Sequence, residues 1–278
     1  MLQQFETKKT LDVSKDTPNT EQFFTLRDFL EAVGFAVLVA LLLKMFVVDI
    51  FQIPSHSMSP TLQEGDFILV SKVSYFWGLP DEIPFTSISM PLSKYRIQLH
   101  TIKRNEIVVF KFPNKEVSND YFVKRVIGIP GDKIILTENE VYINYKNERS
   151  LPHNQSLIGV RTPSLRLDDS VFISVPKVGE VLKLRVENLQ IWKQLIEDEG
   201  NEIELRNGII SINGIPSKTY TIKENYYYVM GDNRLNSYDS RYWGFVPERT
   251  IIGKPLFIYW SSSKDTYMRT DRIGSWIN

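Results

Sequence analysis

The chain contains no cysteine among its 278 residues. Disulfide bonds, thiolate nucleophiles and cysteine-based metal sites are therefore excluded. It also has no excess of charge, because 33 Lys and Arg residues balance 33 Asp and Glu residues. A dedicated nucleic-acid-binding protein needs a basic surface. The balance of charges therefore argues against a nucleic-acid partner.

Histidine is scarce as well, with His56, His100 and His153 the only examples. No two of them have the spacing of metal ligands, and there is no His-Glu-x-x-His run. A zinc site needs several convergent ligands of this kind. We therefore expect no metal and no cofactor.

Residues 29–48 are mostly apolar, broken by Glu31 and Lys44, and lie in the segment 28–50 that follows a polar stretch. Roughly 20 helical residues span about 30 Å, the thickness of the bilayer core. Residues 37–43 read Val-Leu-Val-Ala-Leu-Leu-Leu, which is apolar on every face of a helix and favours lipid over a soluble core. Leu43–Phe46 offers no small-x-small cleavage site, which argues against a removable signal peptide. The segment is therefore predicted to be an uncleaved transmembrane anchor.

Residues 1–27 are predicted to form a poorly ordered cytoplasmic tail. They are polar and carry Lys8, Lys9, Lys15 and Arg27. Positive residues beside a membrane span favour the cytoplasmic side. The large domain that follows the anchor would then lie outside the cell membrane.

The rest of the chain reads as β structure. Short β-branched or aromatic runs are bounded by Gly, Pro, Asn and Asp, as strands usually are. The clearest of these runs are 66–70, 106–112 and 121–127. A sheet-rich core is the expectation.

One pattern occurs twice, in residues 131–144 and 200–213. Each copy reads Gly-x-x-Ile-x-Leu, then four further residues, then aliphatic-x-Ile-Asn, and the two copies align without a gap. Each predicts a β-hairpin. A functional repeat is less favoured, since neither copy carries a candidate nucleophile or base. Between them, residues 186–199 predict a short helix.

Ser57 is the candidate nucleophile, in the run 54–62 just beyond the anchor. A serine hydroxyl needs an adjacent base. His56 is a poor choice, because neighbouring side chains of an extended chain point to opposite faces. Lys124 lies in the apolar run 121–127 and could act only if burial lowered its pKa. Taken alone, the local sequence favours an ordinary strand lysine on a solvated face.

A third run, residues 231–247, begins Gly-Asp-Asn-Arg and is polar. The runs around Ser57, Lys124 and residue 231 together resemble type I signal peptidase. That family comprises membrane-anchored serine proteases that remove signal peptides from exported proteins. The resemblance covers residues 29–260 except for a stretch between the second and third runs.

The resemblance implies a mainly β fold, with an N-terminal transmembrane helix and an antiparallel β-sheet catalytic core. Residues 51–135 and 223–278 would form that core. A smaller β-rich domain, residues 136–222, would be inserted into it. The partners implied are the signal peptides of preproteins and the lipid bilayer, and a monomer is expected.

The resemblance also assigns roles to individual residues. Ser57 would attack the scissile carbonyl, and neutral Lys124 would take its proton. The Ser55 hydroxyl and the Ser57 backbone N–H would stabilise the oxyanion, although Ser55 is also a plausible turn residue. Ser237 would hold the lysine amine by a hydrogen bond. The supporting residues would be the ion pair Asp239 and Arg241, together with the structural residues Asp232 and Arg234.

Two positions depart from the family pattern, because His56 replaces a usual glycine and Leu235 a usual aspartate. A shallow apolar pocket would select small residues before the cut. Its lining positions would be Ile53, Ile68, Val109 and Val123, each of which is equally compatible with plain core packing. Residues 75–79 form an aromatic cluster that suits either the bilayer interface or the core. Another Ser/Lys protease and an inactive anchored homologue are the alternative functions.

Overall fold

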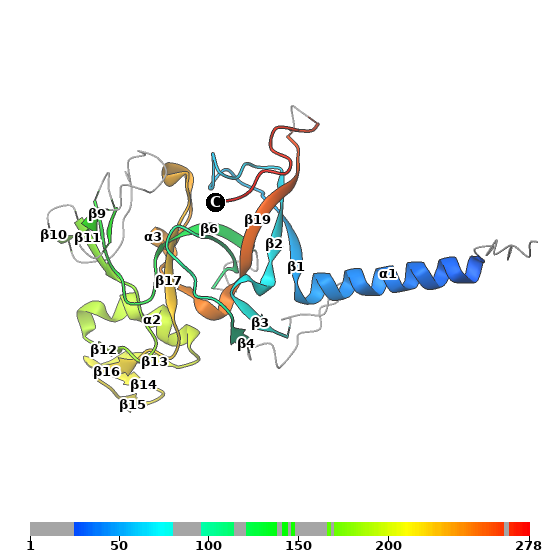
Figure 1. Cartoon of the computed structure of the whole chain (residues 1–278). Coiled ribbons are helices and arrows are strands. Elements are labelled where there is room, and N and C mark those ends of the chain that lie inside the picture. Colours follow the sequence, from blue (N-terminus) through cyan, green and yellow to red (C-terminus); the bar gives the residue numbers. More distant parts are fainter. Residues whose placement is uncertain are drawn as a thin grey trace, which may run out of the picture. The chain divides into compact units, whose positions relative to one another are not determined.

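The computed structural model describes most of the chain beyond the N-terminal tail (Figure 1). The N-terminal 24 residues and His153 lie outside the described residues. The chain divides into two compact units, residues 1–40 and 41–278. The described ranges are 25–79, 96–113, 121–137, 141–143, 146–147, 166–167, 170–263 and 267–278.

Helix α1, Leu26–Phe46, is long and apolar enough to cross a membrane, and none of its residues is buried. Its length, apolar composition and place near the N-terminus are consistent with the predicted membrane anchor. It ends before the predicted boundary at residue 50, because strand β1, Val48–Gln52, begins almost at once. Strand β1 pairs with strand β2, Asp66–Ser71, so these residues satisfy their backbone groups in a sheet.

The main sheet has seven strands and is antiparallel at every pairing, and the predicted mainly β fold is confirmed. Figure 1 shows the long strand β19 lying beside β2. The three predicted strand runs all belong to this sheet. In spatial order its members are β1, β2, β19 (Ile251–Ser261), β5 (Ile107–Lys111), β6 (Tyr121–Gly128), β17 (Tyr226–Met230) and β18 (Val246–Pro247).

Strand β5 is buried on both faces, which explains its continuous apolar sequence. Alternate side chains of a strand point to opposite faces. Ile107 and Val109 therefore pack into one core cluster with Met58, which follows Ser57. Val108 and Phe110 pack into a second cluster on the other face. The loop that carries Ser57 is thus attached to the buried core through Met58.

Both predicted hairpins are formed, and so is the predicted short helix, α2, at Leu189–Asp198. The second hairpin turns at Asn207 and Gly208, both with positive φ, as a two-residue turn requires. The remaining strands are short. They are β3 (Phe76–Gly78), β4 (Arg96–Gln98), β7 (Lys133–Leu136), β8 (Val141–Ile143), β9 (Lys146–Asn147), β10 (Arg166–Leu167), β11 (Ser170–Ser174), β12 (Val181–Lys183), β13 (Ile203–Arg206), β14 (Ile209–Ile212), β15 (Ile215–Pro216) and β16 (Thr219–Thr221).

The segment between β6 and β17 builds small sheets of its own, outside the main sheet. The first of their strands, β7, starts at Lys133, slightly before the predicted domain boundary at 136. Residues 41–278 nevertheless form one compact unit. The division into a core and an inserted domain stays a prediction.

The aromatic cluster at residues 75–79 divides between core and surface. Tyr75 and Phe76 are buried in the cluster that also contains Val108, whereas Trp77 is 53% exposed. Core packing therefore accounts for two of these rings, and only Trp77 is available at the surface.

Candidate active site

The sheet brings Ser57 and Lys124 together, although 67 residues separate them in the sequence. Ser57 lies in the loop between β1 and β2, and Lys124 lies at the middle of β6. The Lys124 Nζ atom is 2.8 Å from the Ser57 Oγ atom. This is the contact that a serine nucleophile and its general base require.

Lys124 is buried, with 3% of its surface exposed. The solvated-face alternative is therefore wrong for this residue. Burial lowers the pKa of Lys124 from 10.5 to about 8, and the negative charges of Asp239 and Asp232 oppose that shift. A buried ammonium loses hydration, so the neutral amine becomes accessible near neutral pH. Only the neutral amine can accept the serine proton.

Two possible donors surround the nucleophile. The Ser55 Oγ atom is 3.3 Å from the Ser57 Oγ atom. Within the described part of the chain, the backbone N–H of Ser57 makes no hydrogen bond to the protein. Their role as donors to an oxyanion stays a prediction.

Residues of the run 231–247 hold the loop that carries Ser57 in place. The backbone N–H of Asn233 donates to the Ser57 carbonyl at 3.0 Å, and its side-chain amide donates to the His56 carbonyl at 3.1 Å. Sequence reasoning missed Asn233, although it lies within the run 231–247. The available signal was its place beside Asp232 in that run.

Gly231 is needed because the chain passes very close to the nucleophile here. A Cβ atom at this position would lie 2.4 Å from the Ser57 carbonyl oxygen. It would also lie 2.2 Å from the Ser237 Oγ atom. No larger residue fits unless the loop moves.

The predicted hydrogen bond between Ser237 and Lys124 is not formed. Lys124 Nζ instead donates to the Val123 carbonyl at 3.1 Å in addition to its contact with Ser57. The Ser237 hydroxyl is buried and has no hydrogen-bond partner among the described residues. It packs against Gly231, close to the Ser57 carbonyl. Its role as an orienting group stays a prediction.

Asp239 and Arg241 form an ion pair, with the Arg241 Nε atom 2.8 Å from a carboxylate oxygen. Both residues are buried. Asp239 also accepts the Gly231 backbone N–H at 3.0 Å, and Arg241 donates to the Arg234 carbonyl at 2.6 Å. The pair therefore fixes the backbone that approaches Ser57. Its importance for activity stays a prediction.

Asp232 pairs with Arg125, the residue after Lys124. The two nitrogen–oxygen distances are both 2.8 Å, in a bidentate arrangement. Arg234 does not join this pair and donates to the Gly231 carbonyl at 3.1 Å. Leu235 is 58% exposed, so its departure from the family pattern falls on the surface.

The sequence comparisons agree with this geometry. The family model for signal peptidase, peptidase S26, matches residues 26–260. The chain is 35% identical over 260 residues to signal peptidase I of Buchnera aphidicola, covering 86% of this chain and 80% of that one. It is 34% identical over 241 residues to signal peptidase I of Pseudomonas aeruginosa, covering 83% and 70%.

The chain belongs to the signal peptidase family, peptidase S26. A crystal structure of a signal peptidase I from Enterococcus faecalis is 21% identical and covers 56% of this chain and 97% of that one. Its TM-score is 0.28, which is too low to support a shared fold. Membership rests on the sequence matches and makes the chain a serine peptidase.

Neither of the two described histidines, His56 and His100, has its ring in contact with Ser57 in this signal peptidase family member. His56 is exposed and its Nε2 atom is 3.0 Å from Glu64. His100 contacts the Ser74 carbonyl at 3.2 Å. No group of potential metal ligands occurs among the described residues.

The four predicted pocket residues share one hydrophobic cluster with Met58. Ile53, Ile68 and Val109 are buried, and Val123 is partly buried at its edge. The cluster thus adjoins the nucleophile. Whether these side chains line a substrate pocket stays a prediction.

Proposed function

We propose that this protein cleaves N-terminal signal peptides from exported preproteins at the membrane surface. The observation that carries the proposal is the 2.8 Å contact between buried Lys124 and Ser57. Membership of the signal peptidase family and the apolar helix α1 support it.

In the proposed mechanism, the Ser57 Oγ atom attacks the scissile carbonyl carbon and its proton passes to neutral Lys124. The Ser55 hydroxyl and the Ser57 N–H donate to the oxyanion. Lys124 then protonates the leaving amine as the carbon–nitrogen bond breaks. A water molecule, deprotonated by Lys124, hydrolyses the ester, and the proton returns to Ser57.

Substrate choice would follow from the apolar wall beside Ser57. Buried Ile53, Ile68 and Val109, with partly buried Val123, would contact the residues before the cut. A shallow apolar pocket admits Ala and excludes larger side chains. We therefore expect small residues immediately before the scissile bond.

The direct test uses the full chain in detergent with a preprotein that carries a signal peptide. Mass spectrometry of both products locates the cut. We expect one cut, after a small residue at the end of the signal peptide. The absence of a cut, or cuts scattered through the preprotein, would reject the proposed function.

Replacing Ser55 with Ala tests the proposed oxyanion donor. We expect kcat to fall by about 10² to 10³ with little change in KM, because the hydroxyl acts mainly on the developing charge. Steady-state kinetics on a signal-peptide substrate measures both constants. An unchanged kcat would return Ser55 to the role of a turn residue.

We further propose that α1 crosses the cell membrane once, with the N-terminus in the cytoplasm. Arg27 near the start of the helix favours this orientation. A protease added outside spheroplasts should digest the domain after Ile50 and leave the first residues protected. A tag at each end, followed by immunoblotting, distinguishes the fragments. If the domain is digested only after the cells are opened, the domain lies on the cytoplasmic side and the proposed orientation is wrong.

A further inference from the structure

The C-terminal arm, defined here as residues 267–278, folds back along strand β19. The Gly274 N–H donates to the Ile258 carbonyl at 2.7 Å, and the Ile277 N–H donates to the Leu256 carbonyl at 2.9 Å. Ile277 is buried in the same cluster as Met58. The arm lies beyond residue 260, where the match to the family model ends.

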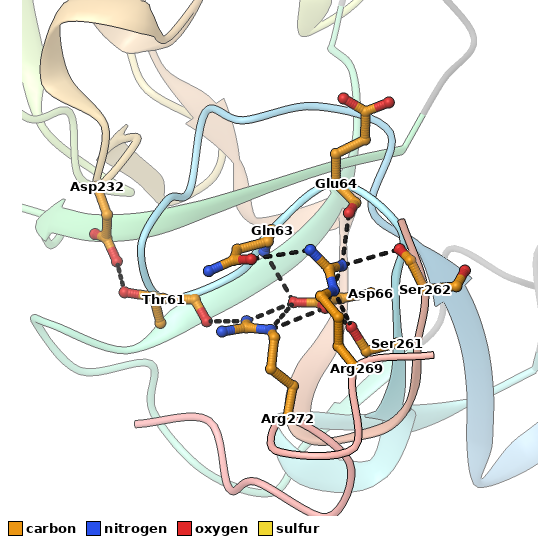
Figure 2. Close-up of polar contacts among 9 residues, drawn as sticks. All are labelled: Thr61, Gln63, Glu64, Asp66, Asp232, Ser261, Ser262, Arg269 and Arg272. Atoms are coloured by element: carbon orange, nitrogen blue, oxygen red, sulfur yellow. Dashed lines mark hydrogen bonds and ion pairs between the residues drawn. The ribbon is translucent and has the colours of Figure 1, made fainter. Parts of the chain in front are cut away.

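The arm supplies two arginines to one buried carboxylate, Asp66, at the start of β2 (Figure 2). Asp66 is 0% exposed. Arg272 reaches it at 2.6 Å and Arg269 at 3.1 Å. Burial raises the pKa of Asp66, but hydrogen bonds from Arg272, the Gln63 N–H and Ser261 outweigh burial and hold the pKa below its usual value. Asp66 is therefore an ionised anchor for the arm.

The two arginines differ in what else they contact. Arg269 also donates to the Glu64 and Ser262 carbonyls, at 2.7 and 3.0 Å. Arg272 instead donates to the Thr61 carbonyl at 3.0 Å. Thr61 belongs to the loop that carries Ser57. Arg269 also contacts this loop, at Gln63 and Glu64, but of the two arginines it is Arg272 that contacts Thr61 among the described residues.

From Thr61 the contacts continue to the strand that carries the base. The Thr61 hydroxyl donates to Asp232 at 2.6 Å, as Figure 2 shows. Asp232 accepts two hydrogen bonds from Arg125, the neighbour of Lys124. Arg125 also donates to the carbonyl of Asn278 at 3.2 Å, and Asn278 is itself a residue of the arm. The contacts thus form a closed ring that begins and ends in the arm.

We infer that Arg272 is a positioning residue, which holds the Ser57 loop against the Lys124 strand through Thr61, Asp232 and Arg125. The inference rests on the proposed function of Ser57 and Lys124 as the reacting pair. Charge-assisted hydrogen bonds in a buried network are strong and directional. A displacement of about 1 Å between reacting groups can cost roughly 100-fold in rate. The ring is suited to prevent such a displacement.

The test compares Arg272→Ala and Thr61→Val with the matched control Arg269→Ala. Each arginine variant leaves Asp66 one arginine, but Arg272 makes three hydrogen bonds to Asp66 and Arg269 makes one, so the stability of each variant is measured beside its activity. We expect kcat to fall roughly 10- to 100-fold in Arg272→Ala and Thr61→Val, with KM little changed. Arg269→Ala should keep kcat near the wild-type value. The double variant of Arg272 and Thr61 should be hardly worse than either single variant, because both interrupt one ring.

A second readout does not depend on signal peptides. p-Nitrophenyl acetate can acetylate the Ser57 Oγ atom, with release of p-nitrophenolate and transfer of the serine proton to Lys124. Intact-protein mass spectrometry follows the rate, with Ser57→Ala as the blank, and a thermal melt shows that each variant is folded. We expect the same order of variants as in cleavage.

The outcomes separate the two proposals. If the wild type is acetylated in a manner that depends on Arg272 but cleaves no preprotein, the proposed function falls and the positioning role stands. If Arg272→Ala and Thr61→Val match Arg269→Ala in both assays, the positioning role is wrong. If wild-type Ser57 is not acetylated and the wild type cleaves no preprotein, there is no reactive pair to position, and both proposals fall.

Discussion

Replacing Ser57 with Ala should abolish preprotein cleavage without changing the thermal melting of the protein. The Ser57 Oγ atom is the only nucleophile in contact with Lys124 among the described residues. Loss of the nucleophile or of its base in a serine protease costs on the order of 10⁴-fold or more in kcat. Lys124→Met should be equally inactive. The double variant should be hardly worse, since members of one catalytic unit are not additive.

The stability of Lys124→Met provides the control for this prediction. Burial of Lys124 lowers its pKa from 10.5 to about 8. The unfolded chain therefore binds a proton more tightly than the folded chain does, and the difference corresponds to roughly 3 kcal/mol. That cost is fully present below pH 8 and disappears as the pH rises through 10.5. Lys124→Met removes the cost.

We therefore expect Lys124→Met to be at least as stable as the wild type at neutral pH, by up to about 3 kcal/mol. The advantage should shrink in alkaline solution. Urea unfolding of both proteins across this pH range measures it. An inactive but destabilised Lys124→Met would mean that the loss of activity reflects unfolding, and substantial activity in either single variant would disprove the dyad.

The strands and hairpins of this fold were predictable because neighbouring residues in the sequence determine them. The strand runs at 66–70 and 121–127 were recognisable from β-branched and aromatic residues between turn formers. The repeated pattern at 131–144 and 200–213 predicted two hairpins, and both are present. The end of the anchor helix was less predictable, because the apolar residues Val47, Val48 and Ile50 suit either a helix or strand β1.

The burial of Lys124 was not predictable from its neighbours in the sequence. An alternating strand gives a lysine and the adjacent arginine one face each, and one face is normally solvated. Here Lys124 contacts the loop that carries Ser57, and Arg125 contacts Asp232 and the carbonyls of Asn105 and Asn278, so both side chains are buried. The resemblance to a family, rather than the local pattern, identified Lys124.

The ring from the C-terminal arm was missed for a similar reason. Arg272 and Thr61 are 211 residues apart, and neither belongs to a pattern that indicates a contact. Such a contact exists only once the order of strands is known. The hydrogen bond between Ser237 and Lys124 is the opposite case, a contact that was predicted but is not formed. The resemblance supplied the pair, but the amine is already bound by Ser57 and the Val123 carbonyl.

The pH dependence of cleavage should distinguish a lysine base from a histidine base. Protonated Lys124 cannot accept the Ser57 proton, so kcat/KM should fall about tenfold for each unit of pH below the pKa of the free enzyme. Burial places that pKa at about 8. The rate should therefore rise through pH 8 and level off above it. With a histidine base, kcat/KM would instead fall below about pH 6.5, the usual pKa of histidine.

Two variants complete this test. Lys124→Arg should be inactive across the whole range, because a guanidinium does not lose its proton in a protein. His56→Gly is the matched control, since His56 adjoins Ser57 in sequence but its exposed ring pairs with Glu64. This variant should keep most of the activity and the same acidic limb. If His56→Gly is inactive while Lys124→Arg cleaves, the base is histidine, and the 2.8 Å contact between Lys124 and Ser57 has no part in proton transfer.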